Sequence, residues 1–553
     1  MKNYTAIRRN RALFSLSLLL LLTMAAAVLV QQREQAEAPA FLTEGGFYQE
    51  PFRLELTVPE GCTVYYTLDS TTPDRNSIPY TDPILIDDAS KQGNVYSMTE
   101  GMHVDQWNAQ LPDHLVDKCT VVRAIAIPDS PLEGKPSKVV TKSYFVGFPE
   151  NHFDGFGVVS LVTDPKNLFD EKTGIYVTGE KLEEYLASAE DPDAIEWAYW
   201  PANFSQRGEA WEREAVVALW DGSGEQLLSQ SVGIRTQGGW SRAYVPRSLN
   251  LFAREKYDGE STFGYDFFGH GYALETMTLS AGGTGHITRM NDYLMSSRVA
   301  DRDYAVMNYQ PYMMFLDGEF WGFYWLTEKY DSNYLQQAYG LGDAEVIIIK
   351  ETQLEAGYEE DLSTYRQLIR FFESTDLSLE ENYARACEMV DLESCLDYYA
   401  TMIYIARNHD WPGSNEALWR TRTVGEAAYA DGKWRWLLYD CNSYCMEGDL
   451  TDHDTLQWAL DRSPVFRSLW ANASFREAFE TRILEIADTC FPAEEMVAFV
   501  ENYRETMETP LKKTWDRFYT TQNRRHIRFN EKMDGTAHFF ANRRAVVESW
   551  FSE

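Results

Sequence analysis

The sequence predicts a multidomain fold class, with an N-terminal transmembrane or signal helix, a small all-β domain and a large α+β domain. The chain has 553 residues, which is too long for a single hydrophobic core. An uncharged apolar run stands near the N-terminus, and short β-like segments follow it. Only beyond them do helix-like and strand-like segments mix. These observations divide the chain into a basic segment, an anchor or signal helix, a linker, a β-sandwich and an α+β domain, at residues 1–11, 12–31, 32–44, 45–150 and 155–553.

The N-terminus carries an export signal of one of two kinds. Basic side chains precede an uncharged run of about 18 residues between Leu13 and Val30, close to the shortest length that spans a membrane. Basic residues before such a run favour an N-terminus inside and a C-terminus outside. Ala25, Ala26 and Ala27 also form a pattern typical of signal-peptidase cleavage. We therefore expect extracytoplasmic C-terminal domains that are either membrane-anchored or secreted after signal cleavage.

The chain is strongly acidic, with 85 acidic and 50 basic side chains and a formal net charge of −35. Such a surface repels nucleic acid, so we expect no nucleic-acid partner. It also repels ATP, so an ATP site would need nearby basic side chains and a divalent metal. No pair of carboxylates stands out as a glycosidase site, and the nine histidines form no metalloprotease motif. Cys441 and Cys445 have a spacing that allows a zinc site, but two buried thiols fit it better.

Residues 47–146 are typical of a small sandwich of short strands. Arg53–Val58 alternates between polar and apolar residues, as a half-buried strand does. The pattern of Tyr65–Pro73, Val122–Ala124 and Ser137–Tyr144 resembles the chitobiase/β-hexosaminidase C-terminal module, which has an immunoglobulin-like fold. That resemblance implies an accessory, non-catalytic domain in a carbohydrate-associated or cell-surface context, where one role is contact with glycan. The alternative is a spacer that holds the next domain away from the membrane.

A turn of two glycines, at residues 238–239, lies between two arginines of the large domain. Strand-like segments precede and follow it, so that Arg235 and Arg242 flank a tight connection and Arg247 lies at the start of the next strand. Glycine permits close approach of the backbone to a phosphate, and arginine pairs with phosphate. The turn is therefore a candidate phosphate contact, although two glycines are more often simply a turn.

A hairpin and a buried strand follow this turn in the chain. Apolar runs on both sides of Asp317–Gly318 predict the hairpin, whose second strand ends at Glu328. The apolar run Val346–Ile349 predicts the buried strand, which ends at Lys350. A lysine at a strand end is usually solvated, and its alternative role here is to bind a phosphate.

A helix, a loop and a second hairpin place three side chains in a meaningful order. Asp391 can cap a helix with apolar residues at helical spacing, and the loop after it contains Asp410 and Asn415. A hairpin around residues 431–432 then ends at Asp440, which it can bring back to the loop. Protein kinases place a base Asp, a metal-binding Asn and a second metal-binding Asp in this order. The alternative is that the three are turn and cap residues.

Together, these stretches resemble successive motifs of the CotH family of spore-coat kinases. The resemblance rests on Gly233–Arg254, Asn308–Tyr334, Asn408–Trp419 and Trp434–Asp440, with helical, aromatic segments at Ser463–Phe479 and Phe539–Phe551 that close the domain. It implies a protein-kinase-like fold, ATP with Mg²⁺ or Mn²⁺ as cofactors, and Ser/Thr phosphorylation of surface or coat proteins.

The resemblance also implies roles for individual residues. It assigns catalysis to Asp410 and metal binding to Asn415 and Asp440. Less directly, it assigns nucleotide or phosphate contacts to a further set of charged residues, which are Arg235, Arg247, Glu328 and Lys350.

Two positions depart from the usual pattern of the family. Arg247 stands where lysine is frequent, and Asn442 stands where a second aspartate is frequent. Arginine keeps the positive charge with a different shape, whereas asparagine keeps a metal-binding oxygen without the charge. ATP is also scarce outside a cell. The alternative function is therefore a catalytically inactive, kinase-like scaffold of the cell surface that is associated with carbohydrate.

Overall fold

The computed structural model describes residues 34–103, 110–130, 134–519 and 525–552. It divides into two compact units. Of the described residues, the first contains those up to Ala89 and those of Cys119–Pro149, and the second contains those of Ser90–Lys118 and those from Glu150 onwards. The predicted basic segment and anchor or signal helix, at residues 1–31, lie outside the described residues. Within the described part, no helix is long and apolar enough to cross a membrane.

The first unit is the predicted β-rich module. Five strands form one sheet in the order β1-β7-β6-β3-β4, and β2 pairs with β5 in a second, two-stranded sheet. The strands are β1 (Gly46–Tyr48), β2 (Phe52–Leu54), β3 (Cys62–Thr67), β4 (Ile78–Pro79), β5 (Ile84–Ile86), β6 (Thr120–Pro128) and β7 (Val140–Val146). Buried residues from both sheets, among them Leu54, Val64 and Val122, form a shared core.

The chain between β5 and β6 belongs to the second unit. The carboxylate of Glu319 accepts hydrogen bonds from the backbone N–H groups of Val95 and Ser97, at 2.5 and 2.6 Å. The guanidinium of Arg247 donates to the backbone oxygen of Met102. These contacts hold this connecting segment in the second unit. The sequence predicted instead that the β-rich domain is continuous from residue 45 to residue 150.

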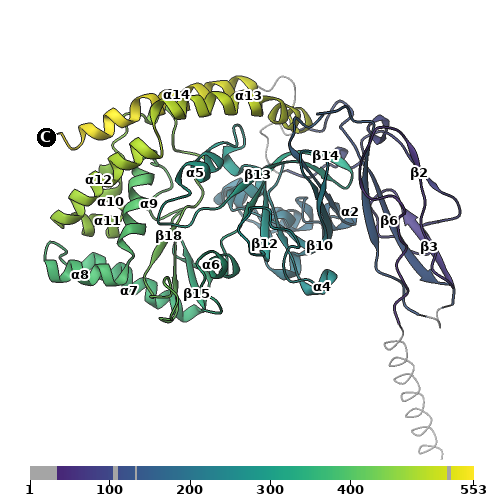
Figure 1. The fold of residues 1–553 in the computed structure, drawn as a ribbon, viewed down its shortest axis with the longest axis horizontal. Helices are drawn as coiled ribbons and strands as arrows, with labels where there is room; N and C mark the ends of the chain where they lie inside the picture. The colour runs from purple at the N-terminus through teal and green to yellow at the C-terminus, as the bar shows by residue number, and fades with distance from the viewer. Residues whose placement is uncertain (1–33, 104–109, 131–133, 520–524, 553) are drawn as a thin grey trace, which may run out of the picture. The chain divides into compact units, whose positions relative to one another are not determined.

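The second unit contains a closed seven-stranded barrel in the order β10-β11-β12-β14-β13-β8-β9 (Figure 1). Its strands are β8 (Gly157–Val162), β9 (Arg213–Trp220), β10 (Gln226–Thr236), β11 (Leu249–Phe252), β12 (Thr276–Ser280), β13 (Tyr309–Leu316) and β14 (Glu319–Glu328). Neighbours are antiparallel except β8 and β13, which run parallel. The predicted hairpin is confirmed in β13 and β14, and its turn has φ values of 48° at Asp317 and 91° at Gly318, which Asp-Gly tolerates.

A second sheet of the same unit has the order β16-β15-β17-β18. Its strands are β15 (Val346–Lys350), β16 (Gln353–Ala356), β17 (Ala417–Thr421) and β18 (Arg435–Leu437). β15 is the predicted buried strand, and the antiparallel pair of β17 and β18 is the second predicted hairpin. The predicted helix before the loop is α9 (Leu392–Tyr404), whose first turn is capped because the Asp391 side chain accepts from the N–H of Ser394.

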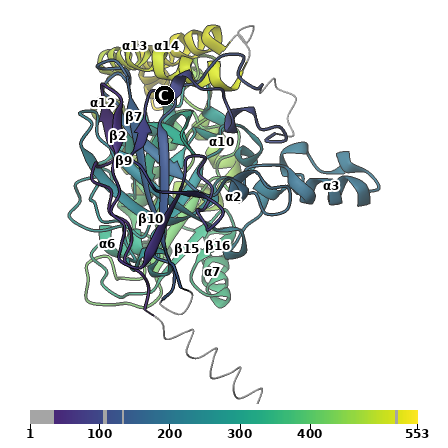
Figure 2. The ribbon, with the colours of Figure 1, turned by 90° about the vertical axis from the view of Figure 1, so that its right-hand side faces the viewer.

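Helices surround the two sheets of the second unit. They are α2 (Pro165–Phe169), α3 (Gly179–Ser188), α4 (Glu255–Asp258), α5 (Asn291–Val299), α6 (Ser332–Ala338), α7 (Leu362–Ser374), α8 (Glu380–Met389), α10 (Thr455–Arg462), α11 (Pro464–Trp470), α12 (Ala473–Thr489), α13 (Ala493–Phe518) and α14 (Arg525–Ser549). The long helices α13 and α14 lie against each other along one side, and α13 packs on β14 (Figure 1). Figure 2 shows α3 standing out from the rest of this unit.

Gly157→Ala should destabilise the barrel where β8 pairs in parallel with β13. A Cβ at Gly157 would lie 2.5 Å from the ring of Tyr312, its partner on β13, and 2.9 Å from the backbone oxygen of Trp220 on β9. Because both neighbours are held within the barrel, we expect the free energy of unfolding in urea to fall by about 1–3 kcal/mol. The matched control is Gly93→Ala, where a Cβ would meet nothing within 4 Å. Equal stability of the two variants would contradict this close contact.

Candidate functional site

The loop after α9 is held by a buried arginine. α9 ends at Tyr404, and Ala406, with φ of 57°, turns the chain before Arg407. The Arg407 side chain is 1% exposed, and its Nη2 donates to Oδ1 of Asp410 at 2.9 Å. Nδ2 of Asn415 donates to Oδ2 of the same carboxylate at 2.8 Å. The orientation of the Asp410 carboxylate is therefore set from both sides.

Asp440 approaches this loop from the end of β18. It has φ of 56°, and Nδ2 of Asn442 donates to its Oδ1. Burial raises the pKa of Asp440 above its ordinary value, while the cations Arg407 and Lys350 oppose that shift and the carboxylate of Asp410 adds to it. The fold of β17 onto β18 therefore brings Asp440 within electrostatic reach of Asp410.

A glycine-rich loop that the sequence analysis did not single out packs on the residues after Asp440. Oγ1 of Thr284 donates to Oδ1 of Asn442 at 2.5 Å. A Cβ at Gly285 would come 2.3 Å from the backbone oxygen of Asn442, so the close approach of the two chains requires glycine. This loop, which includes η8 (Gly283–Gly285), fixes the amide of Asn442 and, through it, the Asp440 carboxylate.

Asp292, near the start of α5, adds a carboxylate that sequence reasoning also missed. Its Oδ1 accepts from the N–H of Cys441, directly after Asp440, at 2.7 Å. Burial and, next, the charge of Asp440 raise the pKa of Asp292 to about 7, although Arg407 opposes the shift. A single aspartate at the start of a helix carries no distinctive sequence signal, because helix starts commonly contain acidic residues.

Lys350 is the predicted phosphate contact that the structure brings to this region. Its Nζ lies 4.3 Å from the centre of the Tyr439 ring, and Tyr439 directly precedes Asp440. Burial lowers the pKa of Lys350, but Tyr439, Asp440 and Glu351 outweigh it, so that the pKa is raised. The side chain is therefore a stable cation beside Asp440.

Arg235 and Glu328 contact residues other than Asp410, Asn415 and Asp440. The guanidinium of Arg235 stacks over Phe252 at 4.0 Å from the ring centre, and its Nε is 3.7 Å from the carboxylate of Glu212. Glu328 is 1% exposed and accepts from the N–H and Nδ2 of Asn308, at 2.8 and 2.9 Å. Both side chains thus stabilise contacts within the barrel.

Arg247 is completely buried, so the structure gives it a different role from the predicted nucleotide contact. Its guanidinium donates to the backbone oxygens of Arg242 at 2.6 Å, of Tyr176 at 3.2 Å and of Met102. It also lies 4.0 Å from the centre of the Phe204 ring. Removal of the cation from water lowers the pKa of Arg247 to about 10. Arg247 therefore connects three backbone segments of the second unit.

Oxygen ligands suited to a divalent cation are present in this cluster. Asp440, Asn415 and Asp410 offer carboxylate and amide oxygens, the ligand type that Mg²⁺ and Mn²⁺ prefer. In the described part of the chain, no three His, Cys, Asp or Glu side chains are close enough to form a complete metal site. Mg²⁺ usually keeps several waters and takes phosphate oxygens, so it needs only one or two protein carboxylates. The residues therefore fit a cation that arrives with a nucleotide.

Comparison with known families agrees with this geometry. A family model described as CotH kinase protein matches residues 234–547, which are more than half of the chain and include the loop after α9, the glycine-rich loop and Asp440. A second model, described as Fn3 associated, matches residues 52–144 of the β-rich module. No curated protein matches the chain. The resemblance that the sequence motifs suggested is confirmed, and the chain belongs to the CotH kinase protein family.

Proposed function

We propose that the chain is an exported protein kinase that transfers the γ-phosphoryl group of ATP to a Ser or Thr hydroxyl of a surface or coat protein. The observation that carries the proposal is the contact of Asp410 with Arg407 and Asn415 beside Asp440. All four residues fall within the family match, and membership of a kinase family implies the use of ATP. The divalent metal, the acceptor and the location are parts of the proposal.

Asp410 is the proton acceptor in this proposal. The acceptor oxygen forms a bond to the γ-phosphorus, the bond from that phosphorus to the ADP oxygen breaks, and the hydroxyl proton passes to Asp410. Because two contacts already hold its carboxylate, little reorientation is needed when the acceptor arrives. Asn415 donates through its nitrogen, which leaves its amide oxygen, with Asp440, for Mg²⁺ or Mn²⁺. When bound, that cation neutralises part of the phosphate charge.

Local positive charge supports nucleotide binding in an acidic protein. The net charge of −35 opposes the approach of ATP, whose phosphates are negative. Lys350 and Arg407 both act on Asp440 electrostatically, and they offset part of the negative charge of Asp440, Asp410 and Glu351. These two cations and the metal together supply the compensation that the sequence analysis required.

The proposal includes a location and accessory contacts. The basic segment at residues 1–11 and the apolar run at residues 12–31 support export, with a membrane anchor or a cleaved signal peptide as the two forms. The match of the β-rich module to the Fn3-associated family supports an accessory role for it, as a glycan-binding domain or a spacer.

Asp440→Ala should abolish metal-dependent nucleotide binding. We expect ATP with Mg²⁺ or Mn²⁺ to raise the unfolding temperature of the full chain, because a ligand that binds only the native state stabilises it, by about 2.7 kcal/mol at 100 times the dissociation constant. The rise should disappear in Asp440→Ala and remain in Asp449→Ala, which changes an exposed aspartate of η10 (Gly448–Leu450). A folded wild-type chain without any rise at millimolar ATP and metal would refute the proposal and favour the inactive scaffold.

Asp410→Asn should separate phosphoryl transfer from binding. Asparagine cannot take the hydroxyl proton, so we expect the rate of transfer to fall by about 10²–10⁴-fold. ATP with metal should still raise the unfolding temperature, because Asp440 and Lys350 are intact. The rate is measured as ADP release and as incorporation of radiolabelled phosphate into the chain or into surface proteins. Asp449→Asn is the matched control, and an undiminished rate in Asp410→Asn would remove this residue from the reaction.

A further inference from the structure

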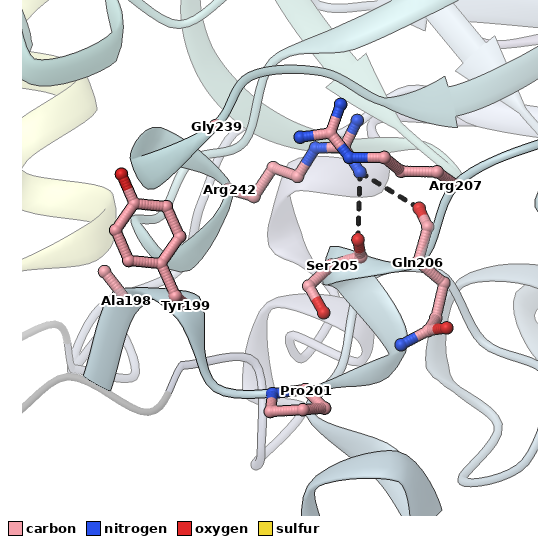
Figure 3. Close-up of a pocket in the computed structure, with 8 residues that line it drawn as sticks. All are labelled: Ala198, Tyr199, Pro201, Ser205, Gln206, Arg207, Gly239 and Arg242. Atoms are coloured by element: carbon pink, nitrogen blue, oxygen red, sulfur yellow. Dashed lines mark hydrogen bonds between the residues drawn. The ribbon is translucent and has the colours of Figure 1, made fainter. Parts of the chain in front are cut away.

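A pocket of about 280 Å³ lies beside the glycine turn at residues 238–239 (Figure 3). Its walls come from the segment before β9 and from the turn with η7 (Trp240–Ala243). The charged side chains that line it are Arg207 and Arg242, and none of its lining residues is acidic. Tyr199, which is 56% exposed, also lines it. The pocket is therefore positively charged within an acidic protein.

Arg242 forms a fixed wall of this pocket. It is 7% exposed, and its Nε donates to the backbone oxygen of Gly238 at 2.7 Å. Its Nη1 donates to the backbone oxygens of Ser205 and Gln206, at 3.2 and 3.0 Å (Figure 3). Burial is the main cause that lowers the pKa of Arg242 to about 10, and the charge of Arg207 adds to it, so the side chain is still a cation at neutral pH. Carbonyl oxygens hold this guanidinium in place without neutralising its charge.

Arg207 converges on the same carbonyl oxygen. Its Nη2 lies 3.5 Å from the backbone oxygen of Gly238, which already accepts from Arg242. Within the described chain, neither guanidinium forms an ion pair with a carboxylate, whereas Arg235 and Arg254 share that of Glu212. Two cations that point at one oxygen repel each other, and an anion between them removes that repulsion. The arrangement therefore favours an anionic ligand.

Two short helices connect the pocket to the proposed reaction site, which contains Asp410, Asn415 and Asp440. η7 packs against η8, and the ring centres of Tyr244 and His286, which follow these two elements, are 5.4 Å apart. Thr284 of η8 bonds Asn442, which follows Asp440 closely in the chain. None of the pocket-lining residues belongs to the catalytic loop or to the segment around Asp440. The pocket therefore has walls of its own and is connected to the reaction site through η7 and η8.

We propose that this pocket binds a phosphate group already present on the acceptor protein, so that the chain phosphorylates acceptors that carry an earlier phosphorylation. The proposal rests on the proposed kinase function for the use of the bound acceptor. Guanidinium forks pair with phosphate oxygens, and a phosphorylated residue carries about −1.5 to −2 charge at pH 7. The pocket has a volume of about 280 Å³, and its charged lining residues are two arginines. A phosphorylated side chain of an acceptor is therefore a ligand whose charge matches that of the pocket.

A short peptide with one phosphoserine tests the pocket without ATP. In calorimetric titrations at low ionic strength, we expect the full chain to bind this peptide more tightly than inorganic phosphate and not to bind the unphosphorylated peptide. Arg207→Glu should weaken the binding by at least about tenfold, the usual cost of losing a hydrogen bond to a charged group. Arg207 is exposed, so its replacement should leave the unfolding temperature unchanged. Arg366→Glu, which makes the same charge change at an exposed position of α7, is the matched control and should bind as the wild type does.

Four results would overturn the proposal. The first is that the wild type does not bind the phosphopeptide, and the second is that Arg207→Glu binds it as tightly as the wild type does. The third is that the wild type binds inorganic phosphate as tightly as the phosphopeptide. The fourth is that Arg207→Glu loses affinity for ATP with metal to the same extent as it loses affinity for the phosphopeptide. The third would make the pocket a site for free phosphate, and the fourth would assign it to the nucleotide. Because the titrations contain no ATP, a chain that binds the phosphopeptide but not ATP would refute the proposed function while it supports the pocket.

Discussion

The buried guanidinium of Arg407 is the constraint on which the site depends. Its side chain is 1% exposed, it contacts Asp410 directly, and it acts electrostatically on Asp440 and Asp292. Carboxylates that gather in one place repel each other, and the net charge of −35 adds to that repulsion. One cation among them lowers the cost, and its removal would leave buried charges without compensation. The loop after α9, the segment after β18 and the start of α5 therefore converge on a single side chain.

Close backbone packing is the second condition for the site. The approach of Gly285 to the backbone oxygen of Asn442 leaves no room for a side chain, and Thr284 then reaches the Asn442 amide. This loop follows β12 of the barrel, and Asp292 lies a short distance further along the same segment. One connection between a barrel strand and a helix thus supplies both the surface on which the residues after Asp440 rest and an additional carboxylate. The barrel and the second sheet contribute jointly to the site for this reason.

Local elements of the fold were predictable, but their assembly was not. The hairpin at Asp317–Gly318 and the helix capped by Asp391 depend on turn chemistry and capping, which act between neighbours in the chain. Closure of the barrel depends on β8 pairing with both β9 and β13, through backbone hydrogen bonds that carry little sequence information. The described residues of 90–118 belong to the second unit because they bond to partners that are distant in the sequence, such as Glu319.

The sequence by itself determined the order of Asp410, Asn415 and Asp440, because a helix, a loop and a hairpin place them through local rules, and the same order carried the family resemblance. Only the tertiary structure decided which charged residues meet. It brought Asp292 to Asp440, and it buried Arg247 among backbone oxygens while it left Arg207 exposed at the pocket. The physical reason is that burial and long-range electrostatics, rather than residue type or spacing, distinguish an arginine that supports the fold from one that is available to a ligand.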